Sequence, residues 1–207
     1  MERRSLQIKE LEIRSAEDGS DTLTGYASVF DSWSDELGGI EPFREKVVKG
    51  AFAETIEKDD IRCLFNHDPN YVLGRNRSGT LTLEEDEKGL KVTIKPPKTA
   101  WAKDLIVSVK RGDISQMSFG FSCELDRWSY EGKVDVRELI KVKLYDVSLV
   151  TYPAYPATEC DVRSIIATRQ AERQKQEAEK QKQQAEEAQK KQLLQQQFME
   201  EFELNDD

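Results

Sequence analysis

The chain has 207 residues, a formal net charge of −9 and a single histidine. The acidic balance disfavours binding to nucleic acids and to anionic membrane surfaces. No apolar run reaches the roughly 18 residues that a membrane-spanning helix needs, and residues 1–15 lack the apolar centre of a secretory signal. We therefore expect a protein that binds neither nucleic acid nor membrane, built as one domain with an appendage.

The three cysteines, Cys63, Cys123 and Cys160, are an odd number without paired short spacing. Together with the single histidine they make no zinc-binding pattern, so we expect no metal and no cofactor. Free thiols are typical of a reducing compartment such as the cytoplasm. We expect each cysteine to act as a small buried apolar residue, and a cysteine nucleophile is the alternative.

Residues 1–165 carry mostly strand patterns, in which apolar and polar residues alternate. In chain order, strands are predicted over residues 6–13, 22–30, 80–94 (as a hairpin), 118–128, 134–144 and 145–152. A turn or short helix is predicted within 42–58, and a helix within 99–113, where one face carries Ala102, Leu105, Ile106 and Val109. We predict a single α+β domain with a mainly antiparallel, barrel-like sheet and helices packed around it.

Residues 166–207 form a tail rich in Gln, Glu and Lys, and after Thr168 it has no Gly, Pro or β-branched residue. Such a segment favours an extended helix but cannot build a core alone. Alanines at heptad spacing suggest a coiled-coil seam of little buried area, and near the end three large apolar residues share one helix face: Leu194, Phe198 and Phe202. The tail is either a solvated helix or a docking segment for a partner.

Residues 116–124, QMSFGFSCE, point to a nucleophile. In a strand, Met117, Phe119 and Phe121 face the core, while Ser118 and Gly120 face the other way and leave open space for a substrate strand. A serine that lies just after the loop that ends a helix is well placed for attack. Ser115 is the alternative, but it falls in that loop.

Residues 141–156, KVKLYDVSLVTYPAYP, contain an acidic residue in an apolar strand. Strict alternation places Val142, Leu144 and Asp146 on one face, and neither face is polar. A buried ionised carboxylate needs a partner, and the chain offers one imidazole, His67. Asp146 would orient His67, which would activate Ser118, as in an acid–base–nucleophile triad. Alternatively, His67 is a turn residue of IRCLFNHDPN and Asp146 binds backbone N–H groups.

Other carboxylates could orient the histidine. Glu138 and Asp113 stay possible, whereas Asp68 is disfavoured because adjacent side chains in an extended segment diverge. The oxyanion of an acyl-transfer reaction needs backbone N–H donors. Candidates for oxyanion or substrate binding are Gly120 and the turn with Gly74 and Arg75. Arg75 could equally serve in a structural ion pair.

Six motifs in order, GYASVF, GAF, LFNHD, LGR, MSFGF and DVSLVTYPAYPAT, resemble the prohead (procapsid) maturation proteases of tailed bacteriophages over roughly residues 5–165. The resemblance implies a serine endopeptidase with the β-barrel fold of the herpesvirus assembly proteases. Its histidine matches His67, its serine Ser118, and its acidic residue Asp146. The herpesvirus proteases use a second histidine instead, and this chain has none.

The resemblance also implies a place and a set of partners. The enzyme would work in the host cytoplasm inside the assembling prohead, where it would cleave the scaffolding protein, or the scaffold domain of the major capsid protein, and finally itself. The tail would dock it on scaffold or capsid shell, and it could form a homo-oligomer. The alternative is a catalytically inactive, protease-like scaffold or assembly protein. An α/β-type serine hydrolase is excluded because no G-x-S-x-G elbow is present.

Overall fold

The computed structural model describes residues 1–7, 11–17, 19–38, 42–131 and 134–152, and in the tail residues 171, 174, 178–179, 181–187 and 189–191. The chain divides into two compact units, Met1–Val162 and Arg163–Asp207. In the second unit the described residues are helical and exposed. The predicted docking residues Leu194, Phe198 and Phe202, and also Cys160, lie outside the described residues.

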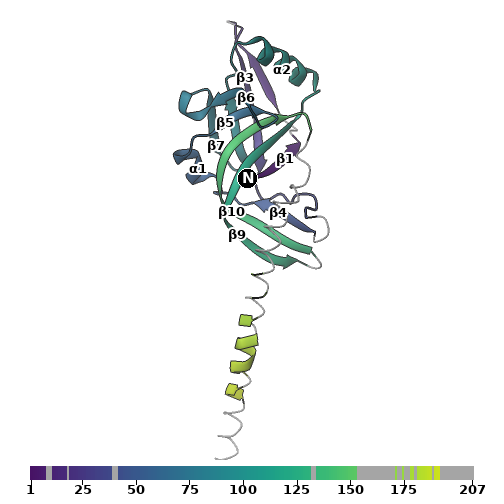
Figure 1. Ribbon diagram of the computed structural model, residues 1–207, viewed down its shortest axis with the longest axis vertical. Helices are drawn as coiled ribbons and strands as arrows, with labels where there is room; N and C mark the ends of the chain where they lie inside the picture. Colours follow the sequence, from purple (N-terminus) through teal and green to yellow (C-terminus); the bar gives the residue numbers. More distant parts are fainter. Residues whose placement is uncertain are drawn as a thin grey trace, which may run out of the picture. The chain divides into compact units, whose positions relative to one another are not determined.

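The first unit is mixed α+β and consists mostly of strands (Figure 1). One sheet has the order β1 (Glu2–Gln7), β9 (Gln116–Glu131), β10 (Val134–Val150), β5 (Arg62–Phe65) and β6 (Asp68–Arg75), and β4 (Phe43–Val47) also pairs with β10. A second sheet has the order β2 (Glu12–Ser15), β3 (Asp21–Val29), β8 (Gly89–Ile94) and β7 (Leu81–Glu85). The long strands β9 and β10 curl, which gives the first sheet the form of a half-barrel.

Several predicted elements are confirmed. The helix α2 (Ala100–Arg111) buries the predicted face of Ala102, Leu105, Ile106 and Val109. The hairpin within residues 80–94 is β7 and β8. The segment within 42–58 is β4 followed by the short helix α1 (Ala53–Lys58), and a 3₁₀ turn, η1 (Asn76–Ser78), precedes β7.

The sheets differ from the prediction in several respects. The single strand predicted over residues 6–13 is wrong, because β1 ends at Gln7 in one sheet and β2 begins at Glu12 in the other. The strands β5 and β6 were not among those predicted. The three strands predicted between residues 118 and 152 are two long strands, β9 and β10, which pair in antiparallel fashion. Most pairs are antiparallel, but β4 and β5 both run parallel to β10. The α1 connection lets β4 and β5 run in the same direction along one edge of β10, which comes much later in the chain. Local alternation carries no information about a pairing between segments so far apart.

The core draws on both sheets and on α2. Met117, Phe119 and Phe121 are buried in it, as predicted from the alternation in β9. Phe119 packs on Phe121 in a stacked pair and on Phe52 edge-to-face. This apolar layer covers one face of β9, so only its other face is available for polar chemistry.

The strict alternation predicted for β10 is wrong at one point. A β-bulge interrupts the pairing between Leu144, which opposes Phe121, and Asp146, which opposes Gly120. The extra residue, Tyr145, shifts the alternation by one. Leu144 therefore faces the core, whereas Asp146 faces the same side of the sheet as Ser118. The bulge separates two residues that were expected to share a face.

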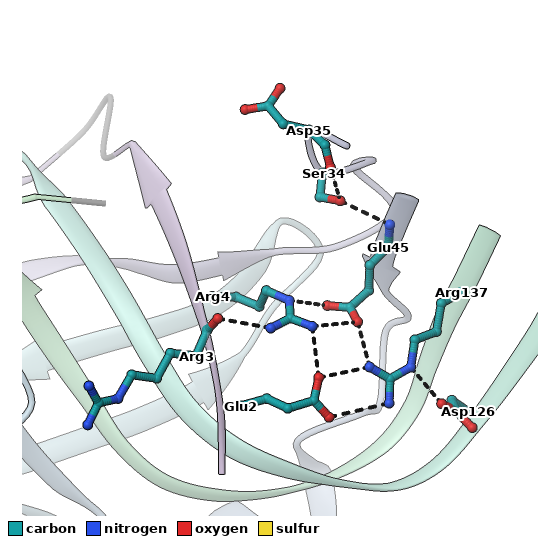
Figure 2. Close-up of polar contacts among 8 residues, drawn as sticks. All are labelled: Glu2, Arg3, Arg4, Ser34, Asp35, Glu45, Asp126 and Arg137. Carbon is teal, nitrogen blue, oxygen red and sulfur yellow. Dashed lines mark hydrogen bonds and ion pairs between the residues drawn. The ribbon is translucent and has the colours of Figure 1, made fainter. Parts of the chain in front are cut away.

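The edge strand β1 is held on β9 by buried charges, which we call the Arg137 cluster: Glu2, Arg4, Glu45, Asp126 and Arg137 (Figure 2). Arg137 donates hydrogen bonds to Glu2 (2.8 Å), Glu45 (2.9 Å) and Asp126 (2.6 Å). Arg4 binds Glu45 at 2.7 Å and Glu2 at 2.8 Å. Burial would lower the pKa of Arg137, but the carboxylates around it, Glu45 first, raise it. The cluster ties β1 to β4, β9 and β10.

Candidate active site

His67 lies in a tight turn between β5 and β6. Phe65 pairs with Asp68, so Asn66 and His67 are the two turn residues, with φ of 53° and 57°. Positive φ at both central positions is typical of a type I′ hairpin turn, and it is uncommon for residues other than glycine. Asn66 fastens the turn to the end of β10: its N–H donates to the Leu149 carbonyl, and its Oδ1 accepts from the Thr151 N–H.

The pairing of β9 and β10 places the other polar groups. Ser118 lies directly opposite Ser148, and Gly120 opposite Asp146, on the face turned away from the core. Parallel pairing of β5 with residues 146–149 of β10 brings the β5–β6 turn to the same place. Three segments far apart in sequence therefore meet at one end of β10.

A continuous chain of hydrogen bonds links these groups. His67 Nδ1 lies 2.6 Å from Asp146 Oδ1, and His67 Nε2 lies 2.7 Å from Ser118 Oγ. An ionised carboxylate only accepts hydrogen bonds, so Nδ1 carries the proton and Nε2 is the acceptor for the Ser118 hydroxyl. The sequence-predicted candidates His67, Ser118 and Asp146 are thus brought together in the order that activation of a serine requires.

The site is buried. Ser118 is 0% exposed, and the side chains of His67 and Asp146 are 5% and 7% exposed. Burial strengthens the hydrogen bonds within such a chain because water does not compete for them. It also means that solvent does not reach the Ser118 side chain in this structure.

Gly120 lies under the carboxylate of Asp146. A Cβ at position 120 would lie 2.4 Å from Asp146 Oδ2, which is closer than real contacts allow. The space over Gly120, expected to admit a substrate strand, is therefore occupied by the Asp146 side chain. Glycine at this position is explained by the close approach of the carboxylate.

Ser148 is a polar member of the site that the sequence reasoning missed. It is 0% exposed, its hydroxyl donates to Asp146 Oδ1 at 2.7 Å, and its Oγ lies 3.3 Å from His67 Nδ1. The available signal was its spacing of two residues from Asp146 in a strand, which puts both side chains on one face. We refer to Ser118, His67, Asp146 and Ser148 as the Ser118 cluster.

The alternative orienting carboxylates have other partners in the described part of the chain. Glu138 accepts hydrogen bonds from Lys46 and Arg127, which lower its pKa. Asp113 pairs with Arg111 at 3.2 Å. Asp68 accepts a hydrogen bond from the Asn70 N–H at 2.9 Å. Ser115, the alternative nucleophile, is exposed and precedes β9.

Gly74 and Arg75 lie on β6, which β10 and β5 separate from β9. A Cβ on Gly74 would lie 2.6 Å from the Thr80 carbonyl oxygen, so this glycine permits a close backbone contact. Arg75 forms a bidentate ion pair with Asp60, with contacts of 2.7 and 2.6 Å. A structural ion pair was one of the two roles predicted for Arg75. Their geometry gives both residues local structural roles.

The cysteine alternative has no support from the described thiols. Cys63 is fully buried, and burial, reinforced by the negative charge of Asp146, raises the pKa of its thiol. Burial raises the pKa of Cys123 to about 12. The thiolate is the reactive form, so neither group is a nucleophile near neutral pH.

Neither a metal-binding cluster nor a membrane-spanning helix is found among the described residues. There, no group of three or more His, Cys, Asp and Glu side chains is arranged to hold a metal ion. In the same part of the chain, no helix is both long and apolar enough to cross a bilayer.

A family model described as caudovirus prohead serine protease matches residues 9–177 of the chain. The chain belongs to this family. The resemblance inferred from the six motifs is thus confirmed, and the match includes every residue of the Ser118 cluster. No curated protein and no solved structure matches the chain, so the likeness to herpesvirus assembly proteases stays a prediction.

Membership connects the chain with a reaction and a setting. The family is one of serine proteases of the prohead of tailed phages. Within a serine protease family, a buried Ser–His–Asp chain of hydrogen bonds is the arrangement to examine for catalysis.

Proposed function

We propose that the protein is a serine endopeptidase of phage head maturation, with Ser118 as the nucleophile, His67 as the general base and then acid, and Asp146 as the residue that orients His67. The observation that carries this proposal is the continuous chain from Asp146 Oδ1 through both imidazole nitrogens to Ser118 Oγ, with contacts of 2.6 and 2.7 Å. It occurs in a member of a serine protease family.

The geometry supports the usual sequence of acyl transfer. Ser118 Oγ attacks the peptide carbonyl carbon while its proton moves to His67 Nε2. The resulting imidazolium is stabilised by the charge of Asp146 at Nδ1. His67 then protonates the leaving amine, and an acyl bond to Ser118 remains. Water, activated by His67, cleaves this ester and restores the serine hydroxyl.

The negative oxygen of the intermediate needs N–H donors near Ser118. Gly120 lies two residues away on the same strand, whereas Gly74 and Arg75 are on the third strand from β9, roughly 14 Å away at the usual strand spacing. The backbone near Ser118 and Gly120 therefore suits this role better. Arg75, with its guanidinium partly exposed, is retained as a substrate-binding candidate.

The proposed substrates are the scaffolding protein, or the scaffold domain of the major capsid protein, and the enzyme itself, inside the prohead in the host cytoplasm. The family supports the setting. The tail from residue 166, with Leu194, Phe198 and Phe202 near its end, is proposed to dock on scaffold or capsid shell. It is also proposed to be removed by self-cleavage.

Intact mass tests the proposed chemistry. The chain is expressed alone and with its scaffold, as wild type, Ser118→Ala and His67→Ala. We expect wild type to shorten itself or the scaffold and both variants to leave all masses unchanged. Identical processing in all three samples would overturn the proposal, and absence of processing in any sample would favour an inactive assembly protein.

Deletion tests the docking role. A chain that lacks residues 169–207 should retain cleavage activity in solution but be incorporated into proheads less than the full chain. Equal incorporation would show that the tail is not the docking segment.

A further inference from the structure

We propose that Ser148 is a positioning residue of this protease, whose hydroxyl fixes the carboxylate of Asp146 and, through it, the imidazole of His67. This inference rests on the proposed function of the Ser118 cluster. Ser148 touches neither the nucleophile's hydroxyl nor a substrate in the contacts that define the site. It acts through Asp146.

The hydrogen bonds assign this role. Asp146 Oδ1 accepts from two donors, His67 Nδ1–H at 2.6 Å and the Ser148 hydroxyl at 2.7 Å. The Ser148 proton is used in that bond, so its oxygen lone pair can face the His67 Nδ1–H, 3.3 Å away. The three groups form a closed triangle. Rotation of the carboxylate or tilt of the ring would break two contacts at once.

Because the site is buried, the hydrogen bond from the Ser148 hydroxyl to Asp146 cannot easily be replaced by water. Ser148 is 0% exposed and Asp146 is 5% exposed, so water cannot readily replace a lost donor. A buried ionised carboxylate depends on the hydrogen bonds it receives. Without Ser148 the charge of Asp146 would be held by fewer donors, and the imidazolium formed during catalysis would be held less firmly in line with Ser118.

The register of β9 against β10 also supports a positioning role for Ser148. The bulge at Tyr145 turns both Asp146 and Ser148 to the active face, and Ser148 lies directly opposite Ser118. One strand pair therefore sets the distances among nucleophile, carboxylate and positioning hydroxyl. A serine that served only the sheet would need no bond to the carboxylate.

The test compares five full-length proteins, prepared without a histidine tag: wild type, Ser148→Ala, Ser148→Thr, Ser118→Ala and a control, Ser122→Ala. Ser122→Ala is the matched control, since Ser122 lies on the same face of β9 and contacts the Tyr145 hydroxyl. The probe is a small alkyl fluorophosphonate. The serine oxygen bonds to phosphorus, the P–F bond breaks, fluoride leaves, and the hydroxyl proton passes to His67.

A second readout is independent of reactivity. His67 is the only histidine, so its imidazole ¹⁵N resonances need no assignment. They report which ring nitrogen carries the proton. Urea unfolding of each variant separates loss of stability from loss of positioning.

The expected result is specific to the hydroxyl. Ser148→Ala should lower the labelling rate constant by roughly 10- to 100-fold, the size of effect seen when a hydrogen-bond partner that orients a metal-binding histidine or carboxylate is removed. It should also convert the single Nδ1–H tautomer of His67 to a mixture. Ser148→Thr, which keeps the hydroxyl, should restore both readouts, and Ser122→Ala should match wild type.

Each other outcome has one meaning. Wild-type labelling and tautomer in Ser148→Ala, with Ser118→Ala unlabelled, would overturn this inference and leave the proposed function intact. Labelling that persists in Ser118→Ala, whether on Ser148 or elsewhere, would overturn the proposed function. If Ser148→Ala does not fold, Ser148→Thr carries the test. A Ser148→Thr protein that folds normally should label at the wild-type rate. A labelling rate constant roughly 10- to 100-fold lower would contradict the role of the hydroxyl.

Discussion

The Ser118 cluster and the Arg137 cluster are both buried polar groups carried by β9 and β10, yet they are built on opposite principles. The Arg137 cluster joins two guanidiniums to three carboxylates through ion pairs (Figure 2). The Ser118 cluster holds one carboxylate, one imidazole and two hydroxyls. Only the second contains a group that can accept and release a proton near neutral pH.

The difference separates stability from reactivity. The ion pairs of the Arg137 cluster hold β1 on the sheet, but the cluster contains no imidazole, and its guanidiniums do not give up their protons. In the Ser118 cluster, the Nε2 nitrogen of His67 faces the Ser118 hydroxyl and can accept its proton. Substitutions in the Arg137 cluster should therefore lower the free energy of unfolding. Substitutions in the Ser118 cluster should abolish the proposed activity while the protein stays folded.

The largest expected effect comes from Asp146→Asn. An amide cannot stabilise the imidazolium and can hold the wrong tautomer of His67, so peptide cleavage should fall by roughly 10⁴-fold. The urea midpoint should change little by comparison. Glu138→Gln is the control, because Glu138 bonds Lys46 and Arg127, and it should cleave nearly as wild type. Equal losses in both variants would remove Asp146 from the site.

Arg137→Ala should have the converse effect. It leaves the buried carboxylates of Glu2 and Glu45, and the partly buried one of Asp126, without their shared partner, which costs about 3–5 kcal/mol of stability. Urea unfolding measures this loss. Arg14→Ala, which removes an exposed pair with Glu12, is the matched control and should change stability little. A fully stable Arg137→Ala protein would show that the cluster does not anchor β1.

Gly120→Ala probes the steric limit of the site. The added methyl would lie 2.4 Å from Asp146 Oδ2 and must displace the carboxylate. A displacement of this kind should lower the cleavage rate by roughly 100-fold while the fold persists. Steady-state kinetics on the scaffold and the far-ultraviolet circular dichroism spectrum measure the two quantities. Wild-type kinetics would mean that Asp146 need not lie over position 120.

The smallest effect concerns Cys63, next to the site on the core side. Burial raises its thiol pKa, so above about pH 8.5 the unfolded thiol ionises while the folded one keeps its proton. The folded state then binds more protons, and stability falls as the pH rises. Between pH 7.5 and 9.5 the contribution is about 1 kcal/mol. Urea unfolding at both values should show a smaller decline for Cys63→Ala, and an unchanged decline would contradict burial of the thiol.

Local patterns were sufficient for much of this molecule. The face of α2, the β7–β8 hairpin and the core face of β9 follow from periodicity over a few residues. The need of a buried carboxylate for a partner suggested that Asp146 and the single imidazole, His67, act with Ser118, and the resemblance of the six motifs to the prohead proteases then favoured this over the alternatives. Apart from that resemblance, these arguments use only residue chemistry and spacing.

Other features depend on long-range pairing. The bulge at Tyr145 is visible only when β10 is registered against β9, and strict alternation therefore grouped Leu144 with Asp146 on one face. The closed space over Gly120 follows from that register. The Arg137 cluster joins four strands, and no local pattern around Glu2 or Glu45 indicated it.

The most direct test is to identify the residue that a fluorophosphonate modifies in a preparation that processes its scaffold. Peptide mass mapping should find one modified residue, Ser118, and no modification in His67→Ala. Modification of another residue, or equal modification of Ser118 in His67→Ala, would contradict the assignment of this hydrogen-bonded chain as the catalytic site.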